Sequence, residues 1–359
     1  MPFVSTGAFN GYIAKATGQL IAYARDPKRY KVAKYTQLVP ADAELFLYYE
    51  IHPDDFVRHH NDYGSVWQDG AKRPEKTGQR IRHRTREGQT IRHDYDFQIG
   101  WKTLKRADYN VLLANTRAAE NECMIAWTTE VLDIAETASN WSGNTADAAD
   151  LAGGAMFDQG TPENPVIKKT LGELAERITL NTNGVAGDFE NADDVGLLLV
   201  VSPHQARRMG SCPEIHAIYK ESLHAKALVG QQAVNPNAVF QLPEYLYGWK
   251  VIVETAVRVS ERPQADADLA STSGSPAPRR FCKNNTSIIV CSRPGGVTGE
   301  IGAPNYSTLQ RYHVGGEMEL KVFDEAKHEY TDGHVVRESV TKLAAPATGF
   351  LITNAFAPE

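Results

Sequence analysis

The sequence of 359 residues is short of cysteine, lacks any long apolar run and shows no recognisable catalytic motif. None of its four cysteines forms a Cys-x-x-Cys pair, and a secreted disulfide-stapled domain would need a denser pattern. We therefore expect four ordinary thiols in a reducing compartment. No apolar stretch approaches the roughly 18 residues of a membrane-spanning helix. The N-terminal residues also lack the basic start and apolar core of a signal peptide.

Three segments contain residue types found in functional sites, but none has the required spacing. The glycines of "RPGGVTGEIGAPN" (residues 293–305) are followed by Ala303-Pro304, where a phosphate-binding loop needs a helix N-terminus. The segment "HPDDFVRHH" (residues 52–60) fits neither a zincin motif nor a zinc knuckle. The histidines near residues 204–224 come without a nucleophile elbow. We therefore expect no catalytic residue, cofactor or metal, and no enzymatic activity.

What the chain does contain is an uneven distribution of charge. Its formal net charge is -6, yet residues 72–93 hold eight Lys or Arg residues and only two Glu. In "GQRIRHRTREGQTIRHDYDFQ" (residues 78–98), four arginines occur at every second position, so that in a strand they would share one face. Nucleic-acid binding and contact with another protein surface both fit such a face.

The same stretch predicts a β-hairpin with Glu87-Gly88-Gln89 as its turn. A three-residue loop would oppose Arg82 to Asp94, and this register is favoured over a two-residue loop because it pairs unlike charges. An isolated hairpin is marginally stable in water, so we expect it to contact another surface. The residues predicted to make that contact are Arg80, Arg82, Arg84, Arg86, Arg92, Asp94 and Asp96.

The first 40 residues are basic and have no clear hydrophobic period, which predicts an extended arm that needs a partner surface. The candidate contact residues of this arm are Arg25, Lys28, Arg29 and Lys31.

The remaining pattern predicts an α+β fold with a mixed or antiparallel sheet. A helix free of Gly and Pro is expected over residues 106–140, with a buried face of Met124, Trp127, Val131, Ile134 and Ala138. A second helix should begin at Asn164-Pro165, burying Ile167, Leu171, Leu174 and Ile178. Strands are expected at residues 44–51, 194–201, 248–257, 286–292, 317–325 and 349–356, and short helices after Ser202-Pro203 and Pro213.

The order of these parts resembles the major capsid proteins of tailed double-stranded DNA bacteriophages, the Hong Kong 97 fold family. The local matches are "LLLVVSPHQARRM", "LYGWKVIVE" and the tail "VVRESVTKLAAPATGFLITNAF". The resemblance implies an N-terminal arm (1–55), an extended β-hairpin E-loop (56–103), a peripheral domain with a long spine helix (104–190 and 300–342) and an axial domain (191–299 and 343–359). No long helical scaffolding segment precedes the arm, which leaves open whether one was removed, is a separate protein or is not used.

If the resemblance holds, the protein self-assembles into pentamers and hexamers of an icosahedral shell in the host bacterial cytoplasm and becomes part of the virion. It would enclose double-stranded DNA without sequence specificity and would work with separate scaffolding, portal and decoration proteins, away from membranes. An encapsulin-like compartment of the same fold is one alternative. A nucleic-acid-binding protein that uses the basic hairpin is another, and its binding would weaken steeply with salt.

Overall fold

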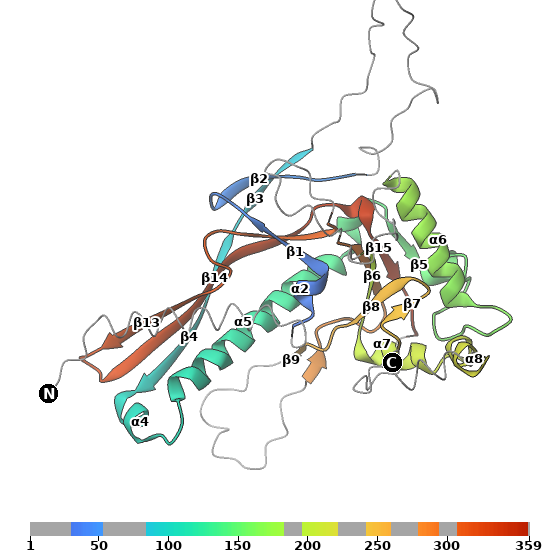
Figure 1. The fold of residues 1–359 in the computed structure, drawn as a ribbon. Coiled ribbons are helices and arrows are strands. Elements are labelled where there is room, and N and C mark those ends of the chain that lie inside the picture. Colours follow the sequence, from blue (N-terminus) through green and yellow to red (C-terminus); the bar gives the residue numbers. More distant parts are fainter. Residues whose placement is uncertain are drawn as a thin grey trace, which may run out of the picture.

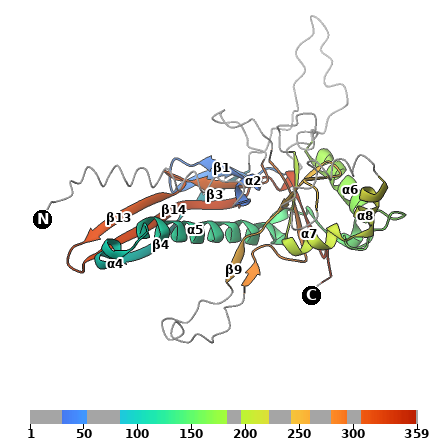
Figure 2. The ribbon, with the colours of Figure 1, turned by 60° about the horizontal axis from the view of Figure 1, so that its bottom comes forward.

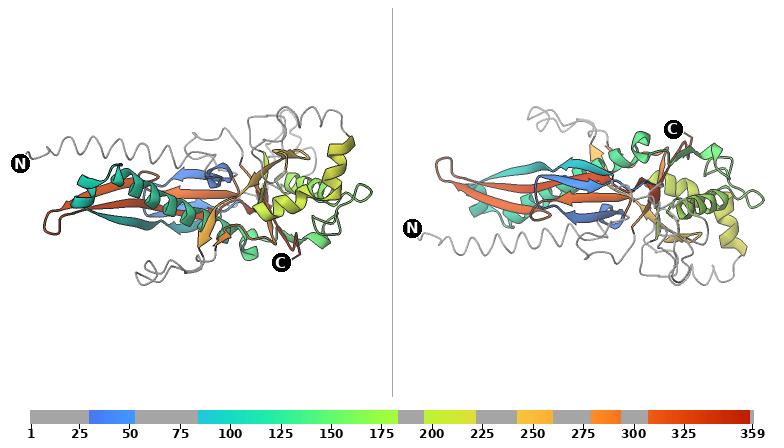
Figure 3. Two further views of the ribbon diagram at one scale, coloured as in Figure 1. Left: turned by 90° about the horizontal axis from the view of Figure 1, so that it is seen from below. Right: turned by 90° about the horizontal axis from the view of Figure 1, so that it is seen from above.

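The computed structural model describes residues 30–52, 84–182, 196–221, 242–259, 279–293 and 307–357. Within these ranges the molecule is elongated, with a long helix lying along one sheet and a second, helix-covered sheet at one end (Figure 1). The helix covers one face of the long sheet, as the views from below and above show (Figure 3). Figure 2 shows the same division between the two ends.

The described helices and turns are the following: α2 (Val32–Tyr35), α4 (Trp101–Arg106), α5 (Val111–Ala135), α6 (Val166–Asn181), α7 (Pro203–Gly210) and α8 (Pro213–Glu221), with 3-10 turns η1 (Ala138–Trp141), η2 (Ala148–Asp150) and η4 (Pro346–Thr348).

The described strands form two large sheets. The first has the order β1 (Thr36–Pro40), β12 (Leu309–His313), β14 (Tyr330–Leu343) and β13 (Glu319–Glu325), with β4 (Ile91–Gly100) also paired to β14. The second has the order β5 (Thr145–Asp147), β15 (Phe350–Thr353), β11 (Ile288–Ser292), β6 (Leu197–Val201), β8 (Trp249–Val253) and β7 (Tyr245–Leu246). Two small ribbons join β2 (Leu45–Tyr49) to β3 (Thr85–Gln89) and β9 (Val257–Val259) to β10 (Arg279–Phe281). Parallel and antiparallel pairs occur in both large sheets, so both sheets are mixed. The presence of helices beside these sheets confirms the expected mixed α/β composition.

The second sheet is buried on both faces, which explains its unbroken apolar strand. Leu198 and Val200 of β6 enter the core formed with α5, while Leu199 and Val201 enter the core formed with α6 and α7. Alternate residues of a strand point to opposite faces, so an apolar residue is needed at every position. The strand predicted over residues 194–201 is confirmed in type and burial over residues 197–201, while residues 194 and 195 lie outside the described ranges.

The helix α6 is also confirmed, because all four residues of its predicted buried face are fully buried. Ser202 caps the next helix, α7. Its hydroxyl accepts from the backbone amide of Gln205, while the Gln205 side-chain oxygen accepts from the backbone amide of Ser202. This reciprocal capping satisfies two amides that the first helical turn leaves unpaired.

The long helix is shorter than predicted at both ends. It begins after Asn110, whose side chain accepts a hydrogen bond from the Leu113 amide and separates α5 from α4. It ends near Ala135, because the Trp141 indole donates to the Ala135 carbonyl and turns the chain back. Ala138 therefore lies outside α5 and is exposed. The other four residues predicted for its buried face pack in or against the core.

Charged side chains join α5 to the first sheet. Arg337 of β14 is fully buried and donates to the Glu130 carboxylate at 3.0 Å, while the other carboxylate oxygen accepts from the Thr341 amide at 2.8 Å. The guanidinium of Arg311 on β12 lies 4.1 Å from the centre of the Trp127 ring. Burial, with Arg337 nearby, lowers the pKa of Arg311 to about 10, so the Arg311 guanidinium stays charged at neutral pH. Glu130 therefore supplies the negative charge that this junction needs.

We predict that Glu130→Ala lowers the free energy of unfolding by about 3 kcal/mol, since it leaves the Arg337 guanidinium buried without its carboxylate. Urea denaturation would measure the loss. The matched control is Glu122→Ala, an exposed position on the same helix, which should change stability by less than about 0.5 kcal/mol. Equal losses in the two variants would contradict the role of the junction.

Candidate assembly interface

The basic stretch does not form the predicted hairpin. Residues 85–89 pair as β3 with the earlier strand β2, and residues 91–100 pair as β4 with β14. Glu87-Gly88-Gln89 is therefore strand rather than turn, and the ladder partner of Asp94 is Val336 of β14. The stretch forms two consecutive strands that belong to different sheets, with Thr90 between them.

A close ring contact explains the glycine that suggested a turn. Gly88 is the ladder partner of Phe46, and a Cβ at Gly88 would lie 2.5 Å from the Phe46 ring. Gly333 and Phe97 repeat the arrangement between β14 and β4, where the corresponding distance is 2.2 Å. In both pairs the ring lies over the opposite backbone, which any larger residue would block.

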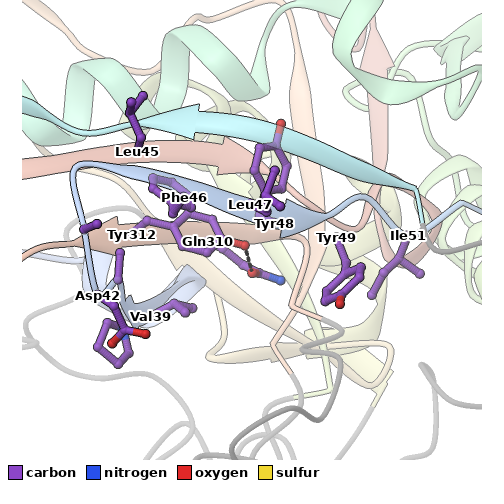
Figure 4. A pocket seen from close by; sticks show the side chains of 13 residues that line it. Val39, Asp42, Leu45, Phe46, Leu47, Tyr48, Tyr49, Ile51, Gln310 and Tyr312 are labelled. Carbon is purple, nitrogen blue, oxygen red and sulfur yellow. Dashed lines mark hydrogen bonds between the residues drawn. The ribbon is translucent and has the colours of Figure 1, made fainter.

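The inner face of the β2–β3 ribbon rests on the first sheet through aromatic contacts. The rings of Phe46 and Tyr48 lie 4.5 Å and 5.6 Å from the ring of Tyr312 on β12. Figure 4 shows Phe46 over Tyr312, beside a groove of about 440 Å³ between β1, β2 and β12. The Tyr312 hydroxyl donates to Gln310 at 2.6 Å within that groove. These aromatic contacts hold β2 of the ribbon against β12.

The outer face of the ribbon carries an exposed apolar row. Leu45, Leu47 and Tyr49 are 71%, 67% and 50% exposed, and strand alternation places them on the side opposite Phe46 and Tyr48. Scattered exposed leucines are normal, but an adjacent row on one strand is typical of an interaction surface. The apolar pattern of residues 44–51 predicted this strand, but not which of its faces is exposed.

One predicted arginine is engaged within the chain. The Arg86 Nε lies 2.6 Å from a carboxylate oxygen of Glu50, whose other oxygen lies 2.9 Å from the Nε2 of His52. Burial alone would raise the pKa of Glu50, but the hydrogen bonds from Arg86 and His52 outweigh it and place the pKa below its usual range. Glu50 is therefore ionised at neutral pH and fastens β3 to the end of β2.

The remaining predicted contact residues divide into those of the ribbon, those of β4 and those outside the described residues. The Arg84 carbonyl accepts from the Glu50 amide at 2.9 Å, which closes the ribbon. On β4, the ladder partners of Arg92, Asp94 and Asp96 are residues 338, 336 and 334. Arg80, Arg82, Arg25, Lys28 and Arg29 lie outside the described residues.

The described part of the predicted arm is anchored to its own chain. Lys31 immediately precedes α2. The next strand, β1, pairs parallel with β12, and the Tyr35 hydroxyl donates to the buried Glu254 at 2.9 Å. Arg293 donates to the carbonyls of Ala33 and Lys34 at 2.5 Å and 3.2 Å. Sequence reasoning missed Arg293 because its partners lie about 260 residues earlier.

In the described ranges, no cluster of three or more His, Cys, Asp or Glu is placed to hold a metal ion. No described helix meets the length and apolarity needed to cross a bilayer. All four cysteines are free and buried.

Solved structures resemble the chain over nearly its whole length. A phage-related protein from Bordetella bronchiseptica matches with a TM-score of 0.62 at 12% identity, covering 95% of this chain and 98% of that one. An encapsulin from Synechococcus elongatus matches with a TM-score of 0.50 at 9% identity, covering 92% and 89%. The mature capsid of bacteriophage PhiM1 matches with a TM-score of 0.49 at 10% identity, covering 91% and 87%. No family model matches the sequence. No curated protein matches it either.

At these identities the likeness shows the fold. The chain has the mixed α/β architecture of the Hong Kong 97 fold, which the resemblance in the sequence had led us to expect.

We predict that Gly88→Ala weakens the ribbon by about 1–3 kcal/mol, since the added methyl group must displace the Phe46 ring from Tyr312. Hydrogen exchange of peptides covering β2 and β3 would measure the effect. The matched control is Gly172→Ala in α6, where a Cβ meets nothing within 4 Å. This control should stabilise its helix by roughly 0.5–1 kcal/mol. Unchanged exchange in the Gly88 variant would contradict the ring contact.

Proposed function

We propose that this chain is the major capsid protein of a tailed double-stranded DNA bacteriophage, assembling into pentamers and hexamers of an icosahedral shell. The observation that carries the proposal is the fold, which matches a phage-related protein over 95% of this chain and 98% of the other. A shell is a virion component built in the host bacterial cytoplasm. Its partners would be other copies of the chain, packaged DNA bound without sequence specificity, and separate scaffolding, portal and decoration proteins.

The surface of the described residues supports assembly from many copies. The exposed row of Leu45, Leu47 and Tyr49 is apolar surface of the kind that obligate assemblies cover. Rings and shells use contacts between different patches of identical subunits, so the row would meet a different surface on its neighbour. The elongated shape gives each copy a large area for such contacts.

The basic stretch has a narrower role in this proposal than the sequence alone indicated. Arg86 already neutralises Glu50 within its own chain. We therefore propose that Arg80 and Arg82 meet acidic surface on a neighbouring copy, where opposite charges steer docking and fix the register. The predicted domain limits of the arm, E-loop, peripheral and axial parts remain part of this proposal.

An encapsulin-like protein compartment is the second candidate, and the likeness to the Synechococcus elongatus encapsulin favours it. The two candidates share an architecture and differ in contents. Nucleic-acid binding by the basic stretch alone is a weaker candidate function, because Arg86 of that stretch already binds Glu50 of its own chain.

Electron microscopy of the purified full chain tests the proposal directly. We expect closed icosahedral particles, since the fold is that of shell proteins. Nuclease-protected DNA inside particles from infected cells would support a virion, and a protein cargo would support the compartment instead. A stable monomer under all assembly conditions would count against both.

We predict that the double charge reversal Arg80→Glu with Arg82→Glu reduces shell yield at least tenfold and leaves the subunit folded. The reason is that repulsion replaces attraction at the proposed contact. Sedimentation and circular dichroism would measure the two properties.

The matched control reverses the same number of charges at Lys168 and Lys169, in the first turn of α6. Acidic residues are favoured in the first turn of a helix because they complement its dipole, so the control should fold. Normal shells from the arginine variant would refute the proposed contact.

A further inference from the structure

His334 lies between two carboxylates on the outer face of the first sheet, opposite α5. Its Nδ1 lies 2.9 Å from an oxygen of Asp94 on β4, and its Nε2 lies 3.1 Å from an oxygen of Asp332 on its own strand β14. The side chain of His334 is about a quarter exposed, at 24%. Neither the fold nor the proposed shell function requires this arrangement.

The protonation state of the ring follows from hydrogen-bond chemistry. A neutral imidazole donates from one nitrogen only, and its other nitrogen carries a lone pair. In the observed geometry that lone pair would face a carboxylate, which is repulsive. A ring that carries both protons donates to both carboxylates and adds opposite charge to each contact.

The other charged groups around the ring do not reverse this preference. In the strand ladders, Asp96 of β4 and Lys321 of β13 are the direct partners of His334 and share its face of the sheet. Lys321 is itself 3.6 Å from Glu319. Burial tends to lower the pKa of His334, but the hydrogen bonds and charges of Asp332 and Asp94 outweigh it and hold the pKa above its ordinary value.

We propose that His334 is a pH-dependent clasp between β4 and β14: the doubly protonated ring joins Asp94 to Asp332, and its deprotonation removes the positive charge that attracts both carboxylates, so the contact with Asp94 on β4 weakens. Since the folded-state pKa is raised, the clasp is complete below the unfolded value of about 6.5 and is lost as the pH rises through the folded pKa. Because β4 continues into β3, the clasp controls how firmly the strand that carries the ribbon is held. This inference goes beyond the proposed function and does not depend on it.

The first test measures the pKa of each histidine in the full chain, from the exchange of the imidazole Cε1 hydrogen followed by mass spectrometry. We expect the pKa of His334 to lie above about 6.5 and to fall in Asp94→Asn. A value at or below the ordinary one, or no change in Asp94→Asn, would overturn the proposal.

The second test follows backbone exchange of peptides covering β4, corrected for the intrinsic effect of pH. Protection should fall roughly two- to fivefold as the pH rises through the His334 pKa. The dependence should disappear in His334→Gln and persist in His328→Gln, a control at an exposed histidine of the β13–β14 connection. The same dependence in His334→Gln would sink the idea. If that variant does not fold, Asp94→Asn must flatten the profile instead, and an unchanged profile there has the same meaning.

Discussion

A buried charged contact joins the long helix to the long sheet, beside the apolar core that the two elements share. Two guanidinium groups, those of Arg311 and Arg337, are removed from water at the same place, and each would be unfavourable there by itself. The Glu130 carboxylate binds one of them and also a backbone amide of β14, while the Trp127 ring faces the other. Backbone pairing places β4 and β13 on either side of β14, and the charged junction fixes where α5 lies on β14.

The sequence was sufficient for elements whose pattern reflects local structure. The buried face of α6 and the apolar strand β6 were predictable because period and burial agree there. The strand β14 was not recognised at its full length of 14 residues. Its inner positions hold Arg337 and other polar residues whose partners are distant in sequence, so the usual alternation is missing.

The same limit explains the candidate site. Of the four alternating arginines, Arg86 lies in the described strand β3, and the pairing partner of that strand was wrongly assigned to the nearest acidic segment. The true partner of β3 is β2, some 40 residues earlier, and the clue lay in the size of Gly88 rather than in its flexibility. A glycine that receives a ring and a glycine that makes a turn look identical in a single sequence. The apolar pattern around Leu47 predicted a strand. It could not show that one face of this strand stays exposed, because exposure depends on which surfaces the rest of the fold covers.

The continuous run of β3 into β4 has a mechanical consequence. A pull on the ribbon along its length is transmitted through Thr90 into a ladder of ten residue pairs between β4 and β14. Because the load acts along the strand, these pairs resist it together, in shear, instead of opening one after another. Different elements adjoin the two ends of β4: the ribbon strand β3 precedes Ile91, and the helix α4 follows Gly100. Tension applied at the ribbon is therefore spread along the length of the β4–β14 ladder.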